Sequence, residues 1–215
     1  MVFNSKSFSK DLKIARYAYQ YGDAVNYVLI KEYLIQLESV SLTNFVSDTA
    51  KKAFWINVYN GMTNYAIIKY GIKVSMKEEA HFFKRPLFKI GKLSFSLDDI
   101  EHGVLRRNAR GHLEAGDAKL EYMVTRLDYR IHFALNCGAQ SCPAIAFYDE
   151  VSLEEELHLA EASFVSQEFN VVTNERMLQC SALFEWYRED FGNQFLNDPL
   201  YQDYKVTLTA YDWGI

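Results

Sequence analysis

The sequence predicts an α+β fold in which a helical N-terminal part packs on an antiparallel sheet with interleaved helices. Three observations lead to this prediction. Apolar residues recur at helical spacing in the first third of the chain. After residue 88 they alternate with polar residues in short segments, as in strands. Segments with helix-capping residues lie between these strand-like segments. Only 10 Gly and 3 Pro interrupt the 215 residues, and no repeat is visible, so we expect a single domain over residues 1–215.

The first two helices are predicted within residues 1–40. One should span residues 7–21, because Gly22 is the residue type that most often follows a helix end. Residues 29–37 place their apolar side chains on one helical stripe, and residues 23–27 read as a short extended link between the two helices.

A third, longer helix should begin near Ser47 or Asp48, since both are good N-cap residues. We expect it to stop before Gly71. This helix differs from the first two because it carries amide side chains among its apolar residues.

The middle of the chain changes period. Residues 88–97 alternate around Gly91, which predicts a hairpin, and Ser96 and Asp99 then form a capping-box pattern that should open a helix through Arg107. Residues 108–119 contain glycines and several charges and are predicted as a surface loop.

The remaining segments are predicted from the same two periods. They are a strand over residues 130–136, a helix over 152–169, a hairpin within 171–180, a helix over 181–191 and a last strand over 205–210.

Composition excludes several classes of function. The chain is 49% hydrophobic and 24% charged, which is typical of a soluble globular protein and not of a disordered one. A net charge of −5 argues against nucleic acid or membrane surfaces as partners. No apolar run is long enough to span a bilayer and no signal peptide is visible, so the compartment stays open between the cytoplasm and export after removal of a leader. Three cysteines do not make a disulfide framework.

Asn57, Asn60 and Asn64 share one face of the third predicted helix. Such a stripe can be exposed to solvent or bound to loop backbone, or it can form the wall of a pocket. A buried amide without a partner costs about 1–3 kcal/mol. We therefore expect Asn57 and Asn60 to be buried and hydrogen-bonded towards the segment around His132 or the turn after it.

Residues 132–143 carry the strongest chemical signal, because a histidine and two cysteines flank a glycine turn. On a continuing strand Cys137 would lie about 16 Å from His132 and on the opposite face. Cys142 has enough chain to fold back towards His132, and Pro143 would place it at the N-cap of a short helix, where a thiolate is stabilised. Cys142 is thus the preferred nucleophile.

Other interpretations of these cysteines remain open. They could form a Cys137–Cys142 disulfide, act as small buried hydrophobic residues, or bind zinc together with His132 and His102. The spacing matches none of the common structural-zinc patterns, so we predict no metal and no cofactor.

Glu101, His102 and Arg106 lie on the helix predicted after Ser96. Glu101 and Arg106 are five residues apart, slightly more than the best spacing for an ion pair. Glu101 could instead orient an active-site histidine and stabilise its cation. The alternative is that Glu101 and His102 belong to a solvated helix face.

Four ordered blocks resemble the family of domains of unknown function numbered 547. They are AFWINVYN ending at Asn60, LDDIEHGVLR ending at Arg106, RIHFALNCGAQSCP ending at Pro143, and YDW ending at Trp213. The resemblance runs from about Gly22 to the C-terminus and implies a distant similarity to papain-like or transglutaminase-like thiol enzymes. The positions that match the family are Asn57, Asn60, Glu101, His102, Arg106, His132, Cys137, Cys142 and Pro143.

The leading hypothesis is a thiol-dependent hydrolase or acyltransferase that acts on an amide or ester bond. Cys142 would be the nucleophile, His132 the base, and Glu101 or Asn136 the residue that orients the base. Backbone N–H groups near Cys142, with Asn57 or Asn60, would stabilise the oxyanion. The rival hypothesis is a binding or scaffold domain that uses the same pocket for a small molecule or a peptide. The sequence does not identify the substrate or the oligomeric state.

Overall fold

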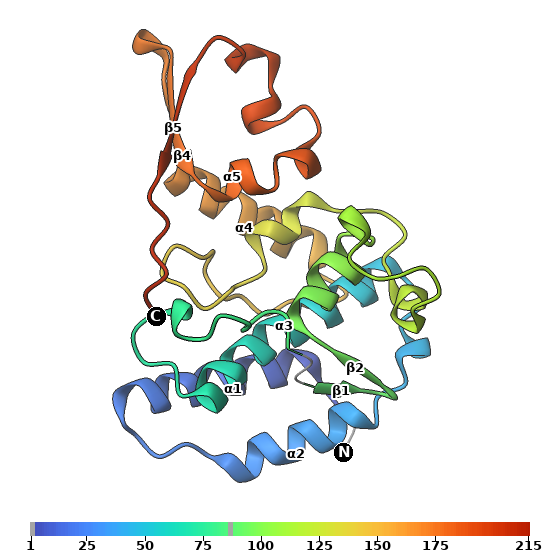
Figure 1. Ribbon diagram of the computed structural model, residues 1–215. Helices are drawn as coiled ribbons and strands as arrows, with labels where there is room; N and C mark the ends of the chain where they lie inside the picture. The colour runs from blue at the N-terminus through green and yellow to red at the C-terminus, as the bar shows by residue number, and fades with distance from the viewer. Residues whose placement is uncertain (1–2, 86–87) are drawn as a thin grey trace.

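Three helices organise the lower part of the molecule (Figure 1). The computed structural model describes residues 3–85 and 88–215. The helices are α1 (Ser5–Tyr21), α2 (Tyr27–Glu38) and α3 (Asp48–Tyr70), close to their predicted limits. The helix α3 is buried along most of its length and lies against α1.

Local side-chain chemistry explains where these helices begin and end. The side chain of Asn4 accepts a hydrogen bond from the Ser7 N–H, and Ser47 does the same for Ala50 at the start of α3. Gly71 ends α3 at a φ of +72°, a conformation that costs glycine little. The predicted N-cap Ser47 is therefore confirmed.

The strands form two small sheets, and the predicted α+β class is confirmed. The strands β1 (Phe88–Ile90) and β2 (Leu93–Phe95) form the predicted hairpin. In the second sheet, β3 (Phe169–Val172) pairs antiparallel with β4 (Met177–Ser181), which pairs parallel with β5 (Lys205–Thr209). The helix α1 packs on α3 and α2 packs against β1, so the N-terminal helices cover α3 and the smaller sheet, and the parallel β4–β5 pair is the part of the sheet structure that is not antiparallel. The papain-like arrangement is not confirmed.

The helical segments after residue 95 are more irregular than predicted. The helix after Ser96 is a π-helix (Asp99–Leu105), opened by reciprocal hydrogen bonds between Ser96 and Asp99. The helix α4 (Leu153–Glu168) agrees with the prediction. The helix predicted over 181–191 is two shorter pieces, α5 (Leu183–Trp186) and a 3-10 helix (Arg188–Phe191).

The strand predicted over residues 130–136 is wrong. Residues Tyr129–Phe133 form a 3-10 helix, and the side chain of Asp128 caps it by accepting the Arg130 N–H. The alternation of apolar and polar residues was misleading because Ile131, His132 and Phe133 are all buried, so the segment has no solvent-facing side.

Further 3-10 turns connect the main elements. They are Leu42–Asn44, Met76–Glu78, Ala109–Gly111, Ala118–Tyr122, Thr173–Glu175, Phe195–Asn197 and Pro199–Tyr201.

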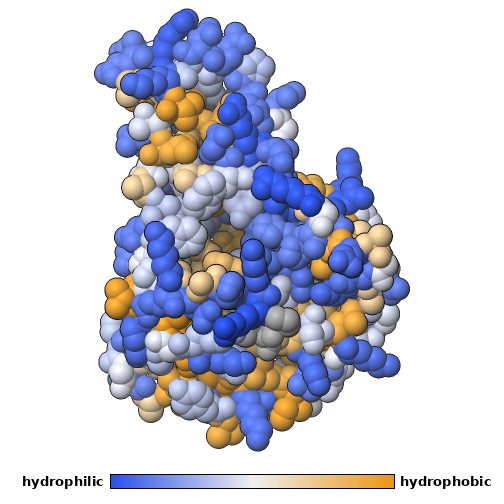
Figure 2. Space-filling model, viewed as in Figure 1, coloured by the Kyte–Doolittle hydropathy of each residue, from blue (hydrophilic) through white to orange (hydrophobic). Residues whose placement is uncertain are grey.

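Buried apolar residues form two clusters. The larger surrounds α3, and the smaller, which includes Phe133, Phe164 and Phe184, lies between α4, α5 and the β3–β4–β5 sheet in the upper part of Figure 1. The helix α2 has exposed apolar residues, such as Val28 and Ile35. Figure 2 shows hydrophobic patches along the lower edge of the molecule, where α2 lies in Figure 1. Among the residues described, every helix is too short or too polar to cross a membrane.

Candidate functional site

A cavity of about 200 Å³ brings most of the predicted site residues together. We call it the cysteine cavity. It lies where the π-helix, the 132–143 segment, α5 and the C-terminal segment meet, and its walls include both cysteines of that segment. Its other lining residues are Tyr59, Phe83, Asp98, Glu101, His102, His132, Leu135, Pro143, Leu183, Trp186, Tyr187, Tyr211 and Trp213. Residues far apart in sequence thus meet in one apolar, partly acidic space.

Cys137 and Cys142 form a disulfide bond, one of the alternatives that the sequence left open. The Sγ of Cys142 accepts hydrogen bonds from the Cys137 N–H at 2.9 Å and from the Tyr211 hydroxyl at 3.0 Å. The same hydroxyl lies 3.2 Å from the Sγ of Cys137. Because burial raises the pKa of Tyr211, this phenol stays protonated and donates to the sulfurs.

The loop around the cysteines has a different shape from the one predicted. No helix follows Cys142, because the Asn136 side chain donates to the Pro143 carbonyl at 2.6 Å and takes the acceptor that a helical turn would use. The predicted N-cap position of Cys142 is therefore wrong, and no helix end stabilises its thiolate.

The backbone N–H groups of this loop are also occupied. Gly138 donates to the Asn136 side chain, Gln140 to the Gly214 carbonyl and Ser141 to the Asp212 carbonyl. Together they hold the disulfide loop against the C-terminal segment. They leave the Cys137 N–H and the Tyr211 hydroxyl as the donors to the sulfur of Cys142.

His132 is almost fully buried and is held by Asp190. Its Nε2 lies 2.7 Å from an Asp190 carboxylate oxygen, and its ring stacks on Tyr187 with ring centres 3.8 Å apart. Burial lowers the pKa of His132, although the hydrogen bond with Asp190 acts in the opposite direction. The neutral ring therefore donates its Nε2 proton to Asp190. Its Nδ1 makes no hydrogen bond to any residue that the structure describes, and neither nitrogen bonds to a sulfur.

Asp190 joins His132 to Arg106. The Nε of Arg106 donates to the same carboxylate oxygen at 2.6 Å. Burial alone would raise the pKa of Asp190, but the hydrogen bonds from His132 and Arg106 outweigh burial and hold the pKa at about 2. Asp190 is therefore ionised at neutral pH and fixes the orientation of the His132 ring.

Arg106 connects this pair to the π-helix and the surface. Its Nη1 lies 2.9 Å from the Nδ1 of His102, and its Nη2 donates to Glu189 at 3.0 Å. The guanidinium is buried, so these partners compensate a charge that would otherwise be costly. Arg106 thus holds His102 and Asp190 at one side of the cysteine cavity.

Glu101 faces two tyrosines. It accepts hydrogen bonds from Tyr187 at 2.6 Å and Tyr59 at 3.1 Å, and it makes no hydrogen bond to His132. Burial and the neighbouring carboxylate raise the pKa of both phenols, which therefore remain donors. Tyr187 connects Glu101 to His132, because its hydroxyl donates to Glu101 and its ring stacks on the imidazole.

The predicted burial of Asn57 and Asn60 is confirmed. Asn60 donates to the Ala134 carbonyl at 3.0 Å and accepts the Asn136 N–H at 2.8 Å, which ties α3 to the segment around His132. Asn57 makes the corresponding pair of bonds with the backbone of Tyr148, a later segment than the one expected. Both amides are committed to backbone groups and neither lines the cysteine cavity, so they are positioning residues.

Residues 3–85 and 88–215 contain no group of three or more His, Cys, Asp or Glu side chains arranged to hold a metal ion. In particular, the sulfurs of Cys137 and Cys142 are bonded to each other, and the Nδ1 of His102 faces Arg106.

Sequence reasoning missed three residues of the site, namely Asp190, Tyr187 and Tyr211. Asp190 is 58 residues from His132, in a segment that reads as an ordinary helix, and no local motif joins the two. The sequence did offer a signal for Tyr211, because this residue begins the YDW block that resembles the family.

The comparisons with known proteins concern the central part of the chain. Residues 43–165 match the family described as a protein of unknown function, DUF547. The matched stretch contains Glu101, His132 and both cysteines of the disulfide, whereas Asp190 and Tyr211 lie beyond it. No curated protein and no solved structure matches the chain. Because the match covers more than half of the 215 residues, the chain belongs to the DUF547 family.

Proposed function

We propose that the protein, once its disulfide is reduced, is a thiol-dependent hydrolase or acyltransferase that acts on an amide or ester bond. The observation that carries this proposal is the cysteine cavity itself, where the sulfur of Cys142 and the oriented imidazole of His132 line the same 200 Å³ space. A nucleophile, a base and a carboxylate that holds the base are the groups that acyl transfer requires.

The nucleophile becomes available when the disulfide opens. A small dithiol reductant supplies two electrons and two protons, and it leaves as its own cyclic disulfide. The sulfur of Cys142 then retains two donors, the Cys137 N–H and the Tyr211 hydroxyl, which favour the thiolate. His132 lines the same cavity, and its Nδ1 stays free to accept a proton because Asp190 holds Nε2.

The reaction follows from these positions. His132 first takes the thiol proton of Cys142 on its Nδ1. The thiolate then attacks the carbonyl carbon and a C–S bond forms, and the C–N or C–O bond breaks as His132 passes that proton to the leaving group. The Tyr211 hydroxyl donates to the oxyanion. Water or an acceptor nucleophile then attacks the thioester, gives its proton to His132 and releases the thiolate of Cys142.

Alkylation of the reduced protein tests the nucleophile. At about pH 6.5, iodoacetamide should modify Cys142 before Cys137 and Cys180, and His132→Gln should slow this modification. Cys180 is an internal control, because burial raises its pKa to about 11. Equal modification of Cys137 and Cys142 would count against the proposal.

Turnover gives the second test. The reduced protein should release p-nitrophenol from a p-nitrophenyl ester with an initial burst, and Cys142→Ser should abolish the burst while Cys180→Ser leaves it unchanged. The same burst in the oxidised protein would exclude Cys142 as the nucleophile.

The second candidate is a non-catalytic pocket for a small molecule or peptide. Two observations favour it, namely the disulfide and the lack of a hydrogen bond between His132 and either sulfur. This candidate predicts that the reduced protein shows no burst and that Cys142 reacts no faster than Cys137.

A further inference from the structure

A second cavity, of about 220 Å³, lies on the α1 side of the disulfide loop. We call it the α1 cavity. It shares Cys142 and Pro143 with the cysteine cavity, but its charged residues are Lys13 and Arg16 of α1. Neither Asp nor Glu is among the residues that line it, and the last residue, Ile215, which also lines it, forms no salt bridge with Lys13 or Arg16. Its size suits a small ligand rather than a drug-sized one, for which pockets of about 300–1,000 Å³ are usual.

Arg16 is an unusual residue to find buried, since only 8% of it is exposed. Its Nη2 donates to the Gly138 carbonyl at 2.9 Å, and its Nη1 makes a long contact of 3.5 Å with Asn64. Its Nε is buried without a hydrogen-bond partner among the described residues. The hydrogen bond to Gly138 uses one of the five N–H groups of the guanidinium. It does not compensate the positive charge of Arg16, because the carbonyl is neutral.

Lys13 adds a second positive charge to the same wall. It precedes Arg16 by three residues and so lies on the same face of α1. Its Nζ donates to the Ile145 carbonyl at 3.3 Å. Within the described part of the chain, no carboxylate forms a salt bridge with Lys13 or Arg16, although the protein carries 28 acidic residues and a net charge of −5.

We infer that the α1 cavity binds a small oxyanion, such as a phosphate or carboxylate group, between Lys13 and Arg16. The contacts of the Arg16 guanidinium and the Lys13 ammonium are neutral, namely carbonyl oxygens and, for Lys13, the rings of Tyr17 and Phe147. They leave hydrogen-bond donors and charge for an anion, and charge-assisted bonds of this kind are strong. Burial also lowers the pKa of Arg16, a cost that a bound anion offsets. The inference does not depend on the thiol chemistry.

The test is a titration of the oxidised full chain with sodium phosphate against sodium chloride at equal ionic strength. Phosphate should raise the melting temperature along a saturating curve, by about 3–6 °C at ten times the dissociation constant. Lys13→Gln should weaken binding about tenfold, because it removes one charge-assisted bond. Lys10→Gln is the matched control, since Lys10 is an exposed residue of the same helix and its loss changes the net charge equally.

The outcomes separate the possibilities. A saturating shift with phosphate alone identifies a phosphate group, and a shift with sodium acetate as well identifies a general oxyanion site that also accepts carboxylates. No saturating shift with either anion overturns the inference. An equal loss of affinity in Lys10→Gln and Lys13→Gln also overturns it, because it would show a diffuse effect of charge. Arg16→Lys keeps the charge on the cavity wall and should retain weaker binding even if Arg16→Gln does not fold.

Discussion

Asn60 is the residue through which α3 holds the segment that carries His132. Its amide satisfies one carbonyl and one N–H of that segment, both buried. We predict that Asn60→Leu lowers the free energy of unfolding by about 1–3 kcal/mol, because it leaves both backbone groups without a partner. Urea denaturation measures the change. Asn174→Leu, at an exposed turn residue, should change stability by less than about 0.5 kcal/mol.

Asp190 makes stability depend on pH. Its pKa is about 2 in the folded protein, below the ordinary value of 3.8, so its contribution is fully present above pH 3.8 and is lost as the pH falls towards 2. The size of this contribution is about 2 kcal/mol.

Asp190→Asn should therefore be less stable than the wild type at pH 7, and the difference should narrow between pH 4 and pH 3. Urea unfolding at the three pH values measures it. Asp203→Asn changes an exposed residue, so its free energy of unfolding should depend on pH as that of the wild type does. A gap that stays constant for Asp190→Asn would show that the ion pair with Arg106 does not govern acid stability.

Part of the site was predictable residue by residue. The burial of Asn57 and Asn60 followed from the cost of an unsatisfied amide, and Glu101, His102 and His132 do line one cavity with Cys142. The partner of His132 was not predictable, because Asp190 reaches it through tertiary folding across 58 residues. The choice between thiol and disulfide depends on how far the loop folds back, and spacing alone left it open.

Among the elements, the crossing of α1 and α3 depends on Gly61. A Cβ atom at this position would overlap the ring of Phe8, so the two helices approach more closely than any larger residue permits. We predict that Gly61→Ala destabilises the protein by about 1–3 kcal/mol through overpacking. A loss of stability would be informative, because at an unobstructed position inside a helix alanine is more stable than glycine by about 1 kcal/mol.

The double variant Gly61→Ala with Phe8→Leu provides the control. The smaller side chain should make room for the new methyl group and recover part of the lost stability. Thermal or urea unfolding of the wild type, the two single variants and the double variant measures this coupling. Strictly additive effects of the two substitutions would show that Phe8 and Gly61 are not in contact.

Elements with a strong period and a cap were predictable from the sequence, and irregular ones were not. The helix α3 has Ser47 before it and Gly71 after it, and its limits were correct. The prediction for the 3-10 helix Tyr129–Phe133 was wrong, because its residues are buried on every side and their apolar pattern resembles that of a strand. The cap by Asp128 was the local signal that distinguishes the two.

At the scale of the whole molecule, charge sets the expected partners. We predict no binding to duplex DNA or anionic vesicles at physiological salt, because a chain with a net charge of −5 releases few counterions. In one basic group, Arg106 and Arg110 are paired with Glu189 and Asp190. Lys84, Lys89 and Lys92 remain as a second basic group.

Fluorescence anisotropy with labelled DNA and co-sedimentation with vesicles measure these interactions. Any binding that falls steeply when the salt concentration is doubled would come from the second basic group, and Lys89→Gln should then reduce this binding. Micromolar affinity that persists at high salt would contradict the prediction.

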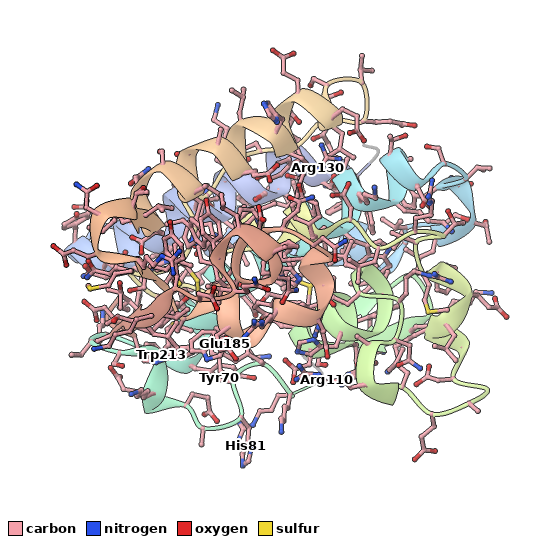
Figure 3. All side chains as sticks on the ribbon, turned by 90° about the horizontal axis from the view of Figure 1, so that it is seen from above. Tyr70, His81, Arg110, Arg130, Glu185 and Trp213 are labelled. Carbon is pink, nitrogen blue, oxygen red and sulfur yellow. A yellow bond between two sulfur atoms is a disulfide. The ribbon has the colours of Figure 1, made fainter. Side chains whose placement is uncertain are left out.

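The aromatic wall of the cysteine cavity gives the protein a built-in optical reporter. Trp186 and Trp213 border the same space as the disulfide, with ring centres 6.0 Å apart, whereas Trp55 is buried in the core (Figure 3 labels Trp213). A disulfide quenches a neighbouring excited indole by accepting its electron. Opening the Cys137–Cys142 bond should therefore brighten two of the three tryptophans, and Trp55→Phe would remove the constant background, so that emission alone follows the redox state of the cavity without an added label.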